Sequence, residues 1–93
     1  MNKYKVHLNE GDEKAKKLYH LCFNDDSISI ERVLKPKIII AYSDMEMVMF
    51  GADGENSMII NENNGHKLRF GIVENRQAIM SSFIGKNVRV AVV

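Results

Sequence analysis

Hydrophobic and polar residues alternate strictly near the beginning of the chain. Tyr4, Val6 and Leu8 fall on one side of an extended segment, and the residues between them are basic or polar. Because side chains of a strand point alternately to opposite faces, this period of two predicts a strand over residues 3–9. The polar and glycine residues that follow are typical of a break in the chain.

The next segment fits two different periods. A helix that begins at Asp12, whose carboxylate suits an N-cap, aligns four side chains at helical spacing. These are Ala15, Leu18, Tyr19 and Cys22. A strand over residues 17–23 is the alternative, because apolar and polar side chains also alternate there. We expect the helix, although the sequence does not decide between the two.

A meander of strands follows. Residues 24–27 have the composition of a turn, and a short strand then runs from Ile28 to the Lys35-Pro36-Lys37 segment, where proline removes a backbone donor. Further strands are predicted between glycine-, asparagine- and aspartate-rich turns. They cover residues 38–42, 45–50, 57–61 and 67–73.

The C-terminal part predicts a helix and a last strand. The helix starts at Glu74 or Asn75 and carries an apolar stripe, and Gly85 is placed for a left-handed C-terminal cap. Alternating valines predict a strand up to Val92. The chain is therefore expected to be a single α+β domain over residues 1–93, with a mostly antiparallel sheet of five to seven strands and one or two short helices packed on it.

Two of the predicted strands are apolar on both faces. Residues 38–42 show no alternation, and residues 45–50 are interrupted only by Glu46. One face of an antiparallel sheet normally remains in contact with water, so these strands need a cover on their second side. We expect the protein itself to supply it, through the helices or a bend of the sheet. A partner surface is the alternative, and Met47 and Met49 would suit one because the thioether adapts to varied contacts.

Composition bounds the class of protein. Hydrophobic residues make up 45% and charged residues 27% of 93 residues, as in ordinary globular domains, and the formal net charge of +1 excludes a generally basic nucleic-acid binder. Cys22 is the only cysteine, which rules out an intrachain disulfide and favours a reducing, cytoplasmic setting. No segment has the apolar length of a membrane span, so no membrane association is expected.

No residue pattern predicts catalysis, a cofactor or a metal. On the expected helix, His20 and Cys22 would diverge by about 200° and so could not form a nucleophile and base pair. The three histidines lie on separate elements without metal-ligand spacing. The segment from Asp53 to Ser57 contains only part of a calcium loop and predicts a plain turn. We expect a protein that is not an enzyme.

The distribution of charge is the most informative feature. Residues 38–66 contain five carboxylates and neither lysine nor arginine. We predict that these acids, together with two methionines on the same strands, bind a basic surface of a partner protein. The predicted partner-binding residues are Asp44, Glu46, Asp53, Glu55, Glu62, Met47 and Met49.

The basic C-terminal segment offers an alternative function. Its cations would contact phosphates in a small nucleic-acid-binding domain, although the aromatic residues that stack on bases are sparse. These cations are Lys67, Arg69, Arg76, Lys86 and Arg89. A simpler explanation is that they pair across the sheet with the acids, each exposed pair contributing little.

In size, composition and lack of a catalytic signature, the chain resembles small accessory proteins of phages and mobile elements, including anti-CRISPR inhibitors of host defence. The resemblance implies a non-enzymatic protein-binding module that acts as an inhibitor. A homodimer joined through residues 45–50, without an external ligand, is a further alternative.

Overall fold

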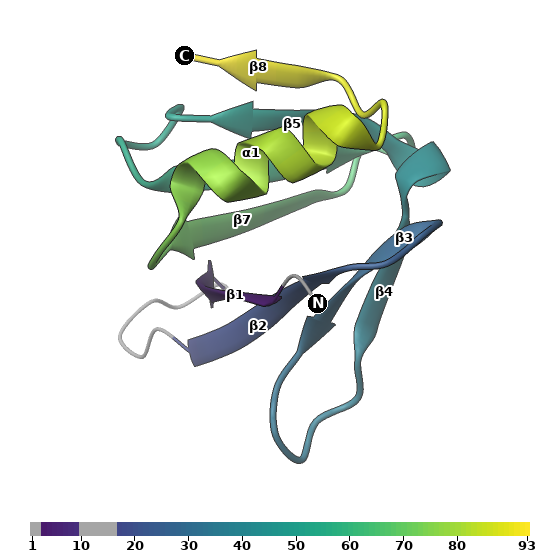
Figure 1. Cartoon of the computed structure of the whole chain (residues 1–93), viewed down its shortest axis with the longest axis vertical. Helices are drawn as coiled ribbons and strands as arrows, with labels where there is room; N and C mark the ends of the chain where they lie inside the picture. The colour runs from purple at the N-terminus through teal and green to yellow at the C-terminus, as the bar shows by residue number, and fades with distance from the viewer. Residues whose placement is uncertain (1–2, 10–16) are drawn as a thin grey trace.

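The structure, a computed structural model, describes residues 3–9 and 17–93. Within them it contains one α-helix, one short 3-10 helix and eight strands (Figure 1). The elements are β1 (Lys3–Asn9), β2 (Lys17–Phe23), β3 (Ser27–Glu31), β4 (Ile38–Ala41), η1 (Tyr42–Asp44), β5 (Met45–Phe50), β6 (Ser57–Glu62), β7 (Lys67–Ile72), α1 (Arg76–Gly85) and β8 (Val90–Val92).

The strands form one mixed sheet in the order β4-β3-β2-β1-β7-β6-β5-β8. All neighbours pair antiparallel except β5 and β8, which are parallel. The predicted α+β class with a mostly antiparallel sheet is confirmed, but the prediction of five to seven strands is wrong, because the sheet has eight strands and one pair of them is parallel. The chain leaves β7, passes through α1 and returns beside β5, and such a crossover connection is what parallel pairing requires.

The helix covers one face of the sheet. Figure 1 shows α1 in front of β5 and β7. Strands β3 and β4 lie at a steep angle to β5 and β7. The sheet has two halves, β4-β3-β2-β1 and β7-β6-β5-β8. The inward side chains of both halves pack with the helix in one core, whose largest completely buried members are Phe50, Phe70 and Phe83. The bend of the sheet and the helix together cover the inner face of the sheet.

The outer face of the sheet is covered less completely. Ile59 is buried there between its cross-strand neighbours Met49 and Arg69. Met47 and Met49 remain half-buried, and Ile39 on the edge strand β4 is 65% exposed. The described residues thus leave part of the apolar outer face open to solvent.

Residues 17–23 form strand β2, so the expected helix is wrong over this segment and the alternative strand is confirmed. The strand pairs with β1 on one side and β3 on the other, which satisfies its backbone groups in both directions. Tyr19 and Leu21 then point into the core with a period of two. The proposed helix start at Asp12 lies outside the described residues.

The C-terminal cap of α1 is displaced from its predicted position. Gly85 is the last helical residue, and the left-handed conformation falls on Asn87, with φ of 61°. The amide of Val88 donates to the carbonyl of Phe83 at 3.2 Å and the amide of Asn87 to that of Ile84 at 3.1 Å. This is a Schellman motif, in which asparagine replaces the more usual glycine.

Candidate interaction surfaces

The described residues contain no cluster of three or more metal-ligating side chains. Cys22 lies on the outer face of β2, yet it is buried and forms a side-chain hydrogen bond with Glu31. Burial, followed by this hydrogen bond, raises the pKa of the Cys22 thiol. A thiol with a raised pKa is a poor nucleophile.

Three of the five predicted acids lie together at one end of the β5–β6 pair. Asp44 ends η1, Glu46 follows in β5, and Glu62 ends β6 opposite Met45. We name Asp44, Glu46 and Glu62 the acidic corner. Asp44 and Glu62 line one hollow of about 250 Å³. Glu46 and Glu62 line a second hollow together with Met47, Met49 and Lys67.

Hydrogen bonds fix the backbone of the acidic corner. The amide of Asn63 donates to the carbonyl of Asp44 at 2.9 Å, and the Asn63 side chain donates to the carbonyl of Ser43 at 2.9 Å. These bonds tie η1 to the turn after β6. The corner is therefore part of the rigid sheet and not of a loose loop.

The carboxylates of the corner differ in their partners. Glu62 lies 2.6 Å from the Nδ1 atom of His66. Asp44 and Glu46 are exposed, and neither forms an ion pair or a side-chain hydrogen bond with any other described residue. Their negative charge is consequently directed to solvent.

The other two acids lie at the opposite end of the same pair of strands. Asp53 and Glu55 belong to the turn that joins β5 to β6, and a six-residue strand spans about 20 Å. Asp53 pairs with Arg69 at 2.8 Å, and the Glu55 carbonyl accepts a hydrogen bond from Arg76 at 3.1 Å. The structure thus divides the predicted acidic patch into two separate sites.

The basic residues of the alternative prediction are also dispersed. Lys67 and Arg69 lie on β7, with their side chains on the outer face of the sheet. Arg76 and Lys86 lie at the two ends of α1, over the rings of Phe50 and Tyr42. Arg89 is exposed just before β8. No single face gathers these five cations, and two of them are in contact with aromatic rings.

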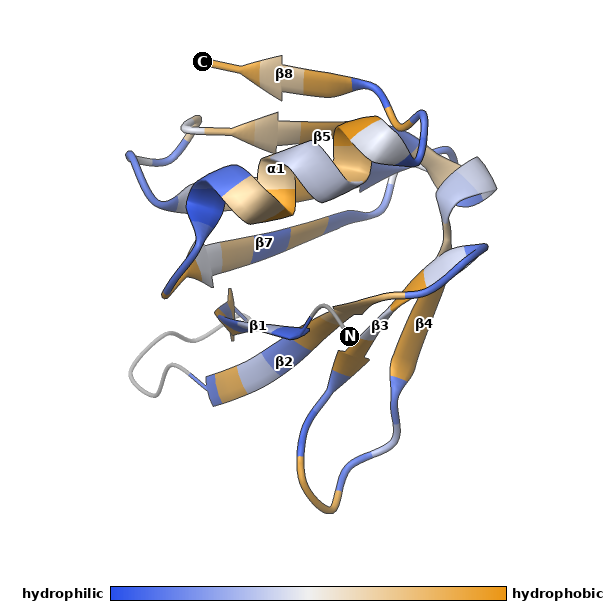
Figure 2. Cartoon of the chain, in the orientation of Figure 1, coloured by the Kyte–Doolittle hydropathy of each residue, from blue (hydrophilic) through white to orange (hydrophobic). Residues whose placement is uncertain are grey.

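Sequence reasoning missed a third surface, the turn between β3 and β4. We name residues 32–37 the basic hairpin. Its turn is closed by the amide of Lys35, which donates to the carbonyl of Arg32 at 3.2 Å. At the tip, Val33 is 85% and Leu34 97% exposed. Figure 2 shows this hairpin projecting from the sheet, with a hydrophobic tip between two hydrophilic arms.

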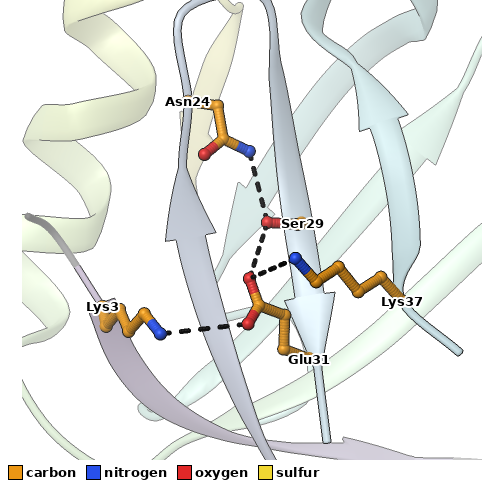
Figure 3. A network of polar contacts seen from close by, with 5 residues as sticks. All are labelled: Lys3, Asn24, Ser29, Glu31 and Lys37. Atoms are coloured by element: carbon orange, nitrogen blue, oxygen red, sulfur yellow. Dashed lines mark hydrogen bonds and ion pairs between the residues drawn. The ribbon is translucent and has the colours of Figure 1, made fainter. Parts of the chain in front are cut away.

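A polar network supports the base of the hairpin on the outer face (Figure 3). Its centre is Glu31, whose carboxylate accepts a hydrogen bond from Ser29 at 3.1 Å. Lys3 and Lys37 approach the same carboxylate at 3.9 Å from opposite sides. The hydrogen bond from the Cys22 thiol, then that from Ser29, lowers the pKa of Glu31. The carboxylate is therefore held in its charged form between two lysines.

Comparison with known proteins identifies a fold and not a family. No protein-family model matches the chain, and no curated protein matches it. Among solved structures, it is similar to the C-terminal domain of an unknown protein from Leishmania infantum, with a TM-score of 0.77 and 13% sequence identity. The similarity covers 92% of this chain and 81% of that one.

Within the described ranges, no helix has the length and apolar character that crossing a membrane takes.

Proposed function

We propose that the chain is a non-enzymatic protein-binding module that engages a basic surface of its partner through the acidic corner. The observation that carries this proposal is the pair of carboxylates Asp44 and Glu46, exposed and without a charged partner among the described residues. These two carboxylates lie beside the half-buried side chains of Met47 and Met49, on a rigid part of the sheet. Such a surface fits an inhibitor that occupies a cationic region of its target.

Charge and apolar contact have different roles in this proposal. The two carboxylates attract a cationic partner over a distance of about one Debye length, which accelerates association and makes it sensitive to salt. Met47 and Met49, half-buried on the adjoining outer face, then adapt to the partner at short range. Glu62 contributes less, because His66 already lies against its carboxylate.

The same geometry limits the alternative of a homodimer through residues 45–50. Strand β5 lies between β6 and β8, and over residues 48–50 both of its edges are already paired. A dimer along this part of the strand would have to use the outer side chains of β5, which include the surface proposed for the partner.

A charge-reversal pair tests the proposal. The tagged chain captures partners from a host extract at low salt, and the captured protein is purified and titrated with Asp44→Lys/Glu46→Lys. Because two exposed ion pairs contribute about 0.2–1 kcal/mol each and reversal adds repulsion, we expect binding to weaken by about tenfold or more, and the difference to shrink in high salt.

The matched control is Asp53→Lys/Glu55→Lys, which makes the same change of charge at the far end of the strands. The affinity of this control for the partner should differ from that of the unchanged protein by less than about twofold, since a distant exposed charge is largely screened. Equal weakening by both double variants would show that total charge matters and not the acidic corner, and the proposal would fail.

A further inference from the structure

We propose that the basic hairpin docks the protein onto an anionic lipid surface, with Val33 and Leu34 entering the bilayer interface and the surrounding cations binding headgroup phosphates. This inference goes beyond the protein-binding role and uses a different part of the molecule. The basic hairpin precedes β4 and the acidic corner follows it, so the two lie at opposite ends of that strand.

The first argument is the exposure of the tip. Val33 and Leu34 are adjacent, large, aliphatic and almost completely exposed, whereas Ile28, Ile30 and Ile40 of the flanking strands are buried in the core. Single exposed hydrophobic residues are common, but a pair at the end of a projecting turn gives the molecule an apolar point. Neither side chain contributes to the core cluster of this domain.

The second argument is the backbone of Leu34. Its φ of 63° lies in the left-handed region, which bulky side chains rarely adopt and which glycine or asparagine would occupy with less strain. The turn therefore carries a residue that suits neither its conformation nor its exposure to water. Backbone strain of this kind is typical of residues retained for function.

The third argument is the arrangement of charge behind the tip. Arg32 lies over the ring of Tyr19, with its guanidinium carbon 5.7 Å from the ring centroid, and Lys37 is held by Glu31. A hollow of about 310 Å³ beside the tip is lined by basic side chains around a single acid. Its lining residues are Lys3, His20, Glu31, Arg32, Val33, Lys35 and Lys37.

Together these features form two layers, an apolar tip and a cationic base. The interface of an anionic bilayer has the complementary order, with phosphates outside and acyl chains within, so the hairpin fits it without a preformed pocket. Arg32 and Lys35 also line a second hollow, so cations face both sides of the hairpin. An acidic protein would therefore need a pocket that receives the tip and places carboxylates on both sides of the hairpin. A planar anionic surface contacts both sides at once.

Vesicle sedimentation with the full chain tests the proposal. Vesicles of phosphatidylcholine containing about 30% phosphatidylserine should bind the protein, while pure phosphatidylcholine vesicles should bind it about tenfold less. Val33→Ser/Leu34→Ser and Lys35→Gln/Lys37→Gln should each reduce binding by about fivefold or more. The control Ile84→Ser, at a helix position that is 57% exposed, should bind like the unchanged protein.

Insertion has a separate reporter, because the chain contains no tryptophan. A Leu34→Trp variant should shift its fluorescence to the blue on addition of the anionic vesicles, and an Ile84→Trp variant should not. Lack of binding to the anionic vesicles, or binding that Val33→Ser/Leu34→Ser leaves unchanged, overturns the proposal. Binding that free inorganic phosphate removes at constant ionic strength also overturns it, since the ligand is then a single anion.

These outcomes are independent of the acidic corner. Asp44→Lys/Glu46→Lys should bind anionic vesicles at least as well as the unchanged protein, because the reversal adds positive charge. A different outcome is that no vesicle binds but a purified acidic protein does, and that this binding depends on Val33 and Leu34. The hairpin is then a protein-docking site, and the lipid proposal fails.

Discussion

Glu31 is the residue whose protonation should most directly affect the hairpin surface. Its pKa is lowered in the folded protein, first by the hydrogen bond from the Cys22 thiol and then by that from Ser29. A carboxyl group with a lower pKa in the folded than in the unfolded state stabilises the fold above the unfolded pKa, which is about 4.3 for glutamate. This contribution is lost as the pH falls through the folded pKa.

The substitution Glu31→Gln isolates this effect. We expect the variant to unfold at lower urea concentration than the unchanged protein at about pH 6, and the difference to shrink steadily as the pH falls through the folded pKa of Glu31, below which both side chains are neutral. Glu55→Gln, which removes an exposed carboxylate, is the control and should show little difference over the same pH range. A difference for Glu31→Gln that does not vary with pH would mean that packing, and not ionisation, is responsible.

At the scale of the element, Gly51 determines whether β8 can join the sheet. Its φ is +90°, and a Cβ atom there would lie 2.9 Å from the carbonyl oxygen of Val93. The amide of Val93 donates to the carbonyl of Phe50 at 2.9 Å, so the same contact extends the β5–β8 pairing. We expect Gly51→Ala to reduce the free energy of unfolding by about 1–3 kcal/mol, measured by urea denaturation.

Gly85→Ala is the opposing control for this prediction. Gly85 ends α1 without a positive φ, and a Cβ atom there meets nothing within 4 Å. The substitution should stabilise the protein by up to about 1 kcal/mol, because alanine has the higher helix propensity. If Gly51→Ala is also neutral or stabilising, the close approach of Val93 is not part of the folded state.

Most of the strands could be predicted, for two different reasons. Strands β1 and β7 show a period of two, whereas β4, β5 and β6 are predicted within one or two residues because they are short apolar runs that end at turn residues. Residues 17–23 fit both a helix and a strand, and only pairing with β1 and β3 decides between them. Likewise, nothing local indicates that the last strand pairs parallel with β5.

The surfaces were harder to predict than the strands, because they depend on how hairpins fold back. The acids are continuous in sequence, but the β5–β6 turn carries Asp53 and Glu55 to the far end of the strands. The sequence indicates the basic hairpin through two adjacent apolar residues, Val33 and Leu34, which lie between Arg32 and Lys35. We assigned these residues to the end of a strand, since apolar residues before a proline favour an extended segment.

For the whole molecule, Phe83 is the side chain that joins the two halves of the bent sheet. It is completely buried on α1, and its ring lies 4.8 Å from that of Phe23 on β2 and 6.4 Å from that of Phe50 on β5, both edge to face. The two strands belong to opposite halves of the sheet. Their shared contact is therefore one reason that the halves form a single core.

Phe83→Ala should accordingly destabilise both halves together. We expect a loss of about 3–5 kcal/mol in the free energy of unfolding, a large part of the stability of a domain of this size. Hydrogen exchange should accelerate in β2 and β3 as well as in β5 and β6, because removal of the ring leaves a cavity between them. Ile84→Ala, at the exposed neighbouring position, should cost less than about 0.5 kcal/mol. Accelerated exchange in β5 and β6 alone would mean that the two halves fold independently and that the acidic corner and the basic hairpin are not held on one rigid body.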